Sequence, residues 1–175
     1  MSTLYVDTIN EKTSGNGVQI PGHVVQFVYS PRTSLASGVS GSTSSSFIDS
    51  GVSATITPTT NSSIIYGVVT YNYWFSSSTV TDYIVSTIFR NGTNIAGLSG
   101  SGPPTTNNSI YNMQWMQSGN PMATYNNGVT HDFKDAPAST SALTYTLYLR
   151  SYAGGTWSAN WNAQLCSMTL MEIAQ

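Results

Sequence analysis

The densest group of chemically versatile side chains lies in the stretch VTHDFKDAP, which holds His131, Asp132, Lys134 and Asp135. Such a group could bind a metal ion or act as an acid and base pair, but a metal site needs three or four ligands that converge. His131 and Asp132 are adjacent, so in a strand their side chains point to opposite faces. We therefore expect no metal site here, and we interpret the stretch as a solvated loop with a weak ion pair, worth about 0–1 kcal/mol.

The remaining acidic residues do not form a catalytic pattern either. A glycosidase needs two carboxylates roughly 5–10 Å apart in a cleft, and no spacing pairs Asp49 or Asp82 with the acidic residues of VTHDFKDAP. No nucleophile elbow, phosphate loop or paired-cysteine motif is present. The lone Cys166 lies in an apolar run, which favours a small buried core residue. We expect no enzymatic activity and no cofactor, with a polysaccharide-degrading spike as the enzymatic alternative.

A binding site is a stronger candidate, in the stretch YAGGTWSANWNAQ. It places Tyr152, Trp157 and Trp161 among Asn160 and Asn162. Sugar rings stack their C–H faces on aromatic side chains, and their hydroxyls pair with amides, so these residues could bind a glycan. The alternative is that Trp157 and Trp161, four residues apart on one strand face, pack in the core or in an interface. Both interpretations remain open at the level of sequence.

The composition narrows the class of protein. A chain of 175 residues fits one domain plus a small appendage. Only 7% of its residues are charged and its formal charge is −2, whereas ordinary globular chains carry about 25% charged residues. Arg32, Arg90 and Arg150 are isolated, so no nucleic-acid partner is expected. Residues 1–20 lack a secretory signal, and no run reaches the roughly 18 apolar residues that span a membrane, so no membrane insertion is expected.

The periodicity predicts an all-β chain. Strand signals recur about every dozen residues and are separated by Gly, Pro, Asn and Ser, which is typical of an antiparallel β-sandwich or jelly roll. The predicted strands are 4–9, 18–20, 23–30, 46–49, 52–58, 62–75, 82–91, 93–97, 110–117, 122–127, 129–133, 141–152, 157–161 and 165–174. Stretches such as GVSGSTSSS are predicted to be turns.

The long predicted strands are apolar on both faces. In 62–75, Ile64, Tyr66 and Val68 alternate with Ile65 and Val69, although a surface strand should be polar on one side. A two-sheet sandwich has one interior, so a neighbouring subunit is the simplest cover for the second face. The alternative is a large monomeric sandwich with aromatic residues under its loops. The predicted trimer-interface residues are Tyr66, Val68, Tyr71, Tyr73, Tyr148, Met168 and Leu170.

The first 22 residues are predicted to form a separate stem ahead of a head domain at 23–175. Its apolar side chains, Leu4, Val6, Val18 and Ile20, flank the turn-like SGNG. An isolated two-stranded ribbon is marginal in water, so three copies around an axis could bury these side chains against one another. Pro21–Gly22 would then be a joint. The alternative is a frayed tail.

The chain also resembles known proteins. LYVDTINEKTSGNGVQIPGHVVQ, FIDSGVSATITPTTNSSIIYGVVTY, TIFRNGTNIAG, DAPASTSALTYTLYLRS and SMTLMEI are similar to segments of virion proteins of tailed phages of marine bacteria and cyanobacteria. Tyr5 stands where Lys is more usual, and IPG replaces an acidic linker. The resemblance implies a homotrimeric virion surface appendage, a fibre or tail-fibre head with a jelly roll of the C1q/tumour-necrosis-factor type.

In such a protein the stem would contact another virion protein, either a tail adaptor or nozzle or the capsid, and the head could bind a host-surface glycan. The alternative is a capsid decoration or head-fibre protein with a purely structural role.

Overall fold

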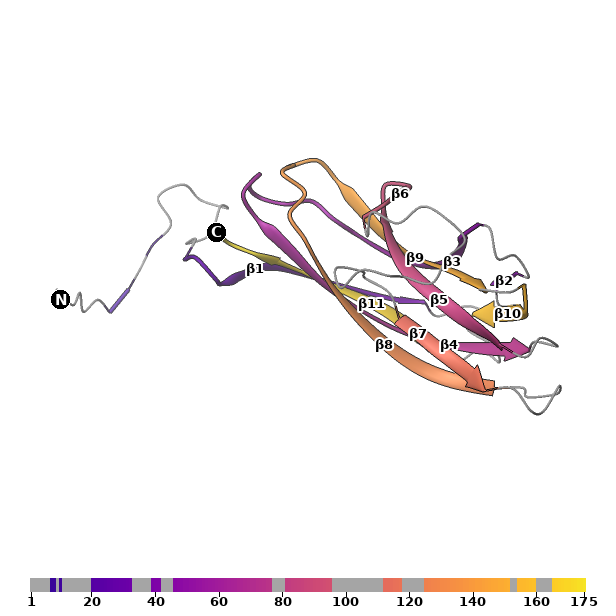
Figure 1. Ribbon diagram of the computed structural model, residues 1–175. Helices are drawn as coiled ribbons and strands as arrows, with labels where there is room; N and C mark the ends of the chain where they lie inside the picture. Colours follow the sequence, from indigo (N-terminus) through magenta and orange to yellow (C-terminus); the bar gives the residue numbers. More distant parts are fainter. Residues whose placement is uncertain are drawn as a thin grey trace.

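The computed structural model describes residues 7, 8, 10, 20–32, 39–41, 46–76, 81–95, 112–117, 125–151, 154–159 and 165–175. This part of the chain is all β, with antiparallel strands in two sheets that pack as a sandwich (Figure 1). The strands are β1 (Val24–Arg32), β2 (Val39–Gly41), β3 (Ile48–Ile56), β4 (Ile64–Ser76), β5 (Thr81–Arg90), β6 (Thr93–Asn94), β7 (Asn112–Gln117), β8 (Tyr125–Asp135), β9 (Leu143–Ser151), β10 (Thr156–Ala159) and β11 (Cys166–Ile173). Among the residues described, no helix could cross a membrane.

The long strand β4 organises the first sheet, here called sheet A. One edge of β4 pairs with β11 along residues 64–70 and with β10 along residues 73–76. Its other edge pairs with β8 along residues 65–75. β1 continues the sheet beyond β11, and β2 continues it beyond β10. One 13-residue strand therefore aligns five of the other segments.

The second sheet, sheet B, has the order β3–β9–β5, with β6 and β7 sharing the far edge of β5. The β5–β6 hairpin turns through Asn91 and Gly92, whose φ angles are 48° and 80°. Positive φ at both central residues is the requirement of the type I′ turn, which explains the Asn-Gly pair in FRNGTN. The turn also contacts β9, because Asn91 N–H donates to the Thr144 carbonyl at 2.9 Å.

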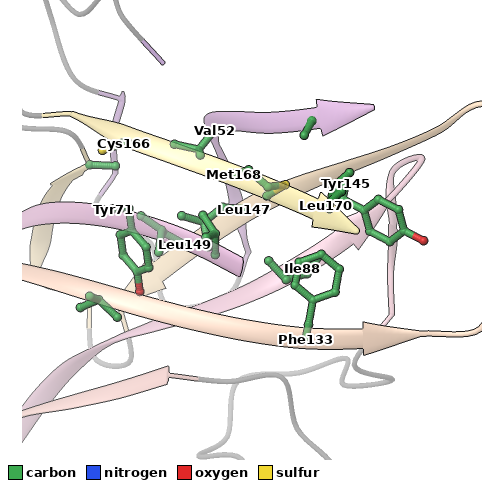
Figure 2. Packing of buried hydrophobic residues seen from close by; sticks show 14 of the residues in the cluster. Val52, Tyr71, Ile88, Phe133, Tyr145, Leu147, Leu149, Cys166, Met168 and Leu170 are labelled. Carbon is green, nitrogen blue, oxygen red and sulfur yellow. The ribbon is translucent and has the colours of Figure 1, made fainter. Parts of the chain in front are cut away.

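The core lies between the two sheets and is made of alternate residues of the long strands. Figure 2 shows Tyr71, Leu147, Met168 and their neighbours packed between the layers. On β9 and β11 every second residue is buried, as in the pattern Leu143, Tyr145, Leu147 and Leu149. The alternation in the sequence thus correctly separated the two faces of β4, β9 and β11, and the structure shows which of the two is the inner face.

Three predicted element boundaries were wrong. The predicted strands 46–49 and 52–58 are both parts of one strand, β3 (Ile48–Ile56), whose pairing with β9 shifts between Asp49 and Ser53. Gly51, at φ 73°, accommodates that bulge, which explains why glycine interrupts the strand pattern. Residues 125–127 and 129–133, predicted in two separate strands, similarly belong to the single strand β8, and β2 lies in a stretch predicted as a turn. Pairing with long partners overrides the local turn signals.

The predicted stem falls mostly outside the described residues, including Leu4, Val6 and Val18. At the joint, His23 N–H donates to the Ile20 carbonyl at 3.0 Å and Gly22 has φ 87°. Proline at the second position of a turn and glycine with positive φ at the third form the pattern of a type II turn. Gly22 N–H also donates to the Ala174 carbonyl at 2.8 Å, so the head begins beside the C-terminal end of β11.

Gly67 on β4 is required by close packing rather than by a turn. It is opposite Phe133 of β8, and a Cβ added at Gly67 would overlap the Phe133 ring. We expect Gly67→Ala to lower the free energy of unfolding by about 2–3 kcal/mol, because overpacking of a tight core is destabilising. Urea denaturation measures the loss. The loss should be smaller in a Phe133→Leu background, and Gly128→Ala is the control because its added Cβ meets nothing within 4 Å. Equal losses in both backgrounds would contradict this explanation.

Glu172 anchors the turn between β3 and β4. Its side chain is buried, and its Oε1 accepts hydrogen bonds from the Thr59 N–H at 2.7 Å, the Thr59 hydroxyl at 2.7 Å and the Ser63 hydroxyl at 2.6 Å. Removing the acceptor leaves buried donors unsatisfied. We expect Glu172→Ala to cost about 3 kcal/mol of stability in denaturant titrations. Glu172→Gln keeps one acceptor oxygen and should cost clearly less; equal losses would show that packing, not hydrogen bonding, dominates.

Candidate functional site

The outer face of sheet A is an apolar surface that the described residues of the chain leave partly exposed. On β1 the side chains of Phe27, Tyr29 and Val24 are 62%, 56% and 52% exposed. The surface continues across the sheet from β1 to β11 and β4, because Phe27 lies opposite Met171 and Met171 lies opposite Tyr66. We name this surface the sheet A face. Its residues are Val24, Phe27, Tyr29, Ile64, Tyr66, Val68, Met171 and Ile173.

The sheet A face is bordered by polar side chains along β8, and Thr169 of β11 and Thr70 of β4 also lie on it. On β8, Thr130, Asp132 and Lys134 point outward, and the Tyr66 hydroxyl donates to Asp132 Oδ2 at 3.2 Å. An apolar area spanning three strands with a polar rim is the pattern of an interaction surface. The chemistry it offers is burial of aliphatic and aromatic side chains, not catalysis.

The predicted interface residues divide between this surface and the core. Tyr66 and Val68 lie on the sheet A face, half-buried, and Tyr148 is half-buried on the outer face of sheet B. Tyr71, Tyr73, Met168 and Leu170 were wrong as interface residues, because they point between the sheets and are at most 3% exposed. Sequence reasoning missed Phe27 and Tyr29. The stretch HVVQFVYS could have indicated them, because it has apolar residues at successive positions and therefore on both faces of the strand, as β4 does.

The VTHDFKDAP stretch is a strand, not a solvated loop, so that interpretation was wrong. His131 faces inward and Asp132 faces outward, as adjacent strand residues must. Asp135 Oδ2 accepts hydrogen bonds from Arg90 Nη1 at 2.6 Å and from the Tyr145 hydroxyl at 2.7 Å. This partly buried ion pair connects β8 of sheet A with β5 and β9 of sheet B. Within the described residues, no group of three or more His, Cys, Asp or Glu side chains could hold a metal ion.

His131 makes the fold sensitive to acid. Burial lowers its pKa from 6.5 to about 4, although the nearby Asp132 carboxylate raises it, and its Nδ1 is 3.4 Å from the Ser86 hydroxyl. The unfolded chain therefore binds the proton more readily than the folded chain. This contribution to stability is complete above about pH 6.5 and falls as the pH falls toward 4.

We expect His131 to account for a loss of about 3 kcal/mol by pH 4. The measurement is the free energy of unfolding from pH 7 to pH 4 for the native chain and for His131→Gln. Because the carboxylates titrate in both proteins, the difference between the two curves isolates His131. Parallel curves would contradict the expectation.

The predicted glycan site is divided by the structure. Trp157, on β10, is fully buried in the core, so the core interpretation of this residue holds and its assignment to a binding surface was wrong. Tyr152, Asn160, Trp161 and Asn162 lie outside the described residues. Ile20, the one predicted stem side chain that is described, is 40% exposed.

An aromatic group missed by the sequence analysis lies on the outer face of sheet B. Phe89 and Tyr148 stack with ring centroids 3.9 Å apart and planes 22° apart. Phe47 meets Phe89 edge-on at 6.1 Å, and the Arg150 guanidinium lies over the Phe47 ring at 5.1 Å. The three aromatic side chains are half-buried, whereas Arg150 is buried. We name Phe47, Phe89 and Tyr148 the sheet B aromatic cluster.

No protein-family model matches the chain, and no curated protein matches it. Among solved structures, it is similar to a chain in the structure of infectious bursal disease virus Gt strain, with 14% sequence identity and a TM-score of 0.31. The similarity covers 98% of this chain and 43% of that chain, so this chain spans less than half of the viral chain's length. A TM-score this low does not establish a shared fold.

Proposed function

We propose that this chain is a non-enzymatic structural protein of a virion surface, a jelly-roll head that associates as a homotrimer. The observation that carries the proposal is the sheet A face, whose apolar side chains have no cover within the described part of one chain. Burial of such a surface is worth about 25 cal/mol per Å² removed from water, which favours association of copies that each present one.

The strand pairing supports the jelly roll. Setting aside the short strands β2, β6 and β10, eight strands remain, and their pairs are β1 with β11, β3 with β9, β4 with β8, and β5 with β7. In chain order these are first with eighth, second with seventh, third with sixth, and fourth with fifth. A long antiparallel ribbon wound around a barrel produces this nested pairing, which is the topology of the jelly roll.

The composition supports self-association rather than a monomer with an exposed apolar surface. Interface cores are poor in charge and rich in aromatic residues, and this chain has 7% charged and 11% aromatic residues. The Lys and Asp side chains of β8 border the sheet A face and do not enter its centre. Little charge therefore has to be desolvated when copies meet.

The assignment to a virion follows from the resemblance of the N-terminal and head segments to tailed-phage virion proteins. In that setting residues 1–22 would attach the head to another virion protein, and the head would form a surface appendage. A tail fibre and a capsid decoration remain alternatives, distinguished by which virion protein cross-links to residues 1–22.

Light scattering of the purified chain tests the oligomer. At micromolar concentration we expect three times the mass of the 18.7 kDa chain. Phe27→Asp should shift the mass toward that of one chain, because it places a charge within the apolar surface that association would bury. Thr55→Asp, on an exposed position of sheet B, is the matched control and should leave the trimer intact. A native chain that remains a single copy would overturn the proposal.

A further inference from the structure

We propose that the sheet B aromatic cluster and the polar side chains around it bind a neutral carbohydrate. The contacts that would bind the sugar all lie within one chain, so they do not depend on the oligomer. The proposal rests on the proposed function in one respect only: if the sheet A face is buried between copies, the outer face of sheet B becomes the wall of the head that meets other molecules.

The stacked pair provides a platform on rigid secondary structure. Phe89 is on β5 and Tyr148 is on β9, two strands that pair along seven residues at the centre of sheet B. Both side chains keep part of their surface accessible. The negative face of an aromatic ring attracts polarised C–H groups, and the C–H face of a pyranose ring presents several of these at once.

Polar groups surround the platform on the same sheet face. Register places Asp49 of β3 opposite Tyr148, and Thr146 and Asn94 opposite Phe89. Thr87 of β5 is buried beneath them, and its hydroxyl donates to Asn94 Oδ1 at 3.2 Å, which holds that amide in place. Asp49 is exposed, and its Oδ1 accepts the Gly51 N–H at 2.6 Å, which holds the carboxylate in place. Burial raises the pKa of Tyr148 and the Asp49 carboxylate raises it further, so the phenol is a hydrogen-bond donor at neutral pH.

The two outer faces differ in the partner that each suits. The sheet A face is a broad area of Val, Ile, Met and aromatic side chains, which protein surfaces match. The sheet B face has a small aromatic centre ringed by hydroxyl, amide and carboxylate groups, including the Thr55–Thr144 pair at 2.8 Å. A few placed polar groups around an apolar centre are typical of small-molecule sites. A neutral sugar has an apolar C–H face that can stack on the aromatic side chains and hydroxyl groups that can pair with the polar side chains around them.

The test uses the full chain and three neutral probes: maltohexaose, cellohexaose and chitotetraose. Binding is measured by ligand-observed saturation-transfer NMR and by calorimetric titration. We expect at least one probe to saturate the native chain. The double variant Phe89→Leu with Tyr148→Leu should weaken that probe at least tenfold, because leucine keeps the apolar cover and removes the ring faces. Tyr66→Leu, a half-buried tyrosine of the sheet A face, is the matched control and should bind as the native chain does.

Failure of all three probes to saturate the native chain would overturn the proposal, as would unchanged affinity in the double variant. If that variant does not fold by circular dichroism, the aromatic resonances of the native chain decide: shifts at Phe89 and Tyr148 on adding the probe support the site, and shifts confined to other aromatic residues overturn it. Phe27→Asp should keep its affinity per chain, so a failed trimer and a failed sugar site give different results.

Discussion

A two-sheet sandwich has one interior, and the strands of this chain have more apolar surface than that interior can hold. The inner faces of β4, β9 and β11 fill the space between the sheets with Tyr, Leu, Ile and Met side chains. The outer face of β4 and β11 is also apolar, and β1 adds Phe27 and Tyr29 at more than half exposure. Most of the proposals above follow from this surplus, because an apolar face outside the core lowers the free energy of the system only when something covers it.

The few ionisable side chains of the interior contact strands or turns that are distant in the sequence. Glu172 accepts three hydrogen bonds from the β3–β4 turn, and Asp135 accepts from Arg90 and Tyr145 across the two sheets. His131 is buried in its neutral form near Ser86. Burial of polar groups is tolerated where partners satisfy them. In a chain with 12 charged residues, each of these placements joins elements that are distant in sequence.

The sequence predicted the class of fold and separated the two faces of the longest strands, but it predicted individual surface residues poorly. Alternation assigns Tyr66 and Tyr71 to opposite faces of β4, but it does not say which face is inside when both are apolar. Trp157 illustrates the same limit, since an aromatic residue between Thr156 and Ser158 fits a binding loop and a core strand equally well. The stacking of Phe89 on Tyr148 had no signal, because the two residues are 59 positions apart and meet only through the β5–β9 register.

By itself, the sequence determined that the chain is all β and that its long strands are apolar on two faces. These properties depend on residue type and spacing over a few positions, so they are local. Only the tertiary structure decided which face is the core, that β8 continues through Gly128, and that His131 and Asp132 have different environments. Those outcomes depend on which strands pair and in which register, and pairing between distant segments is set by the packing of the whole sandwich.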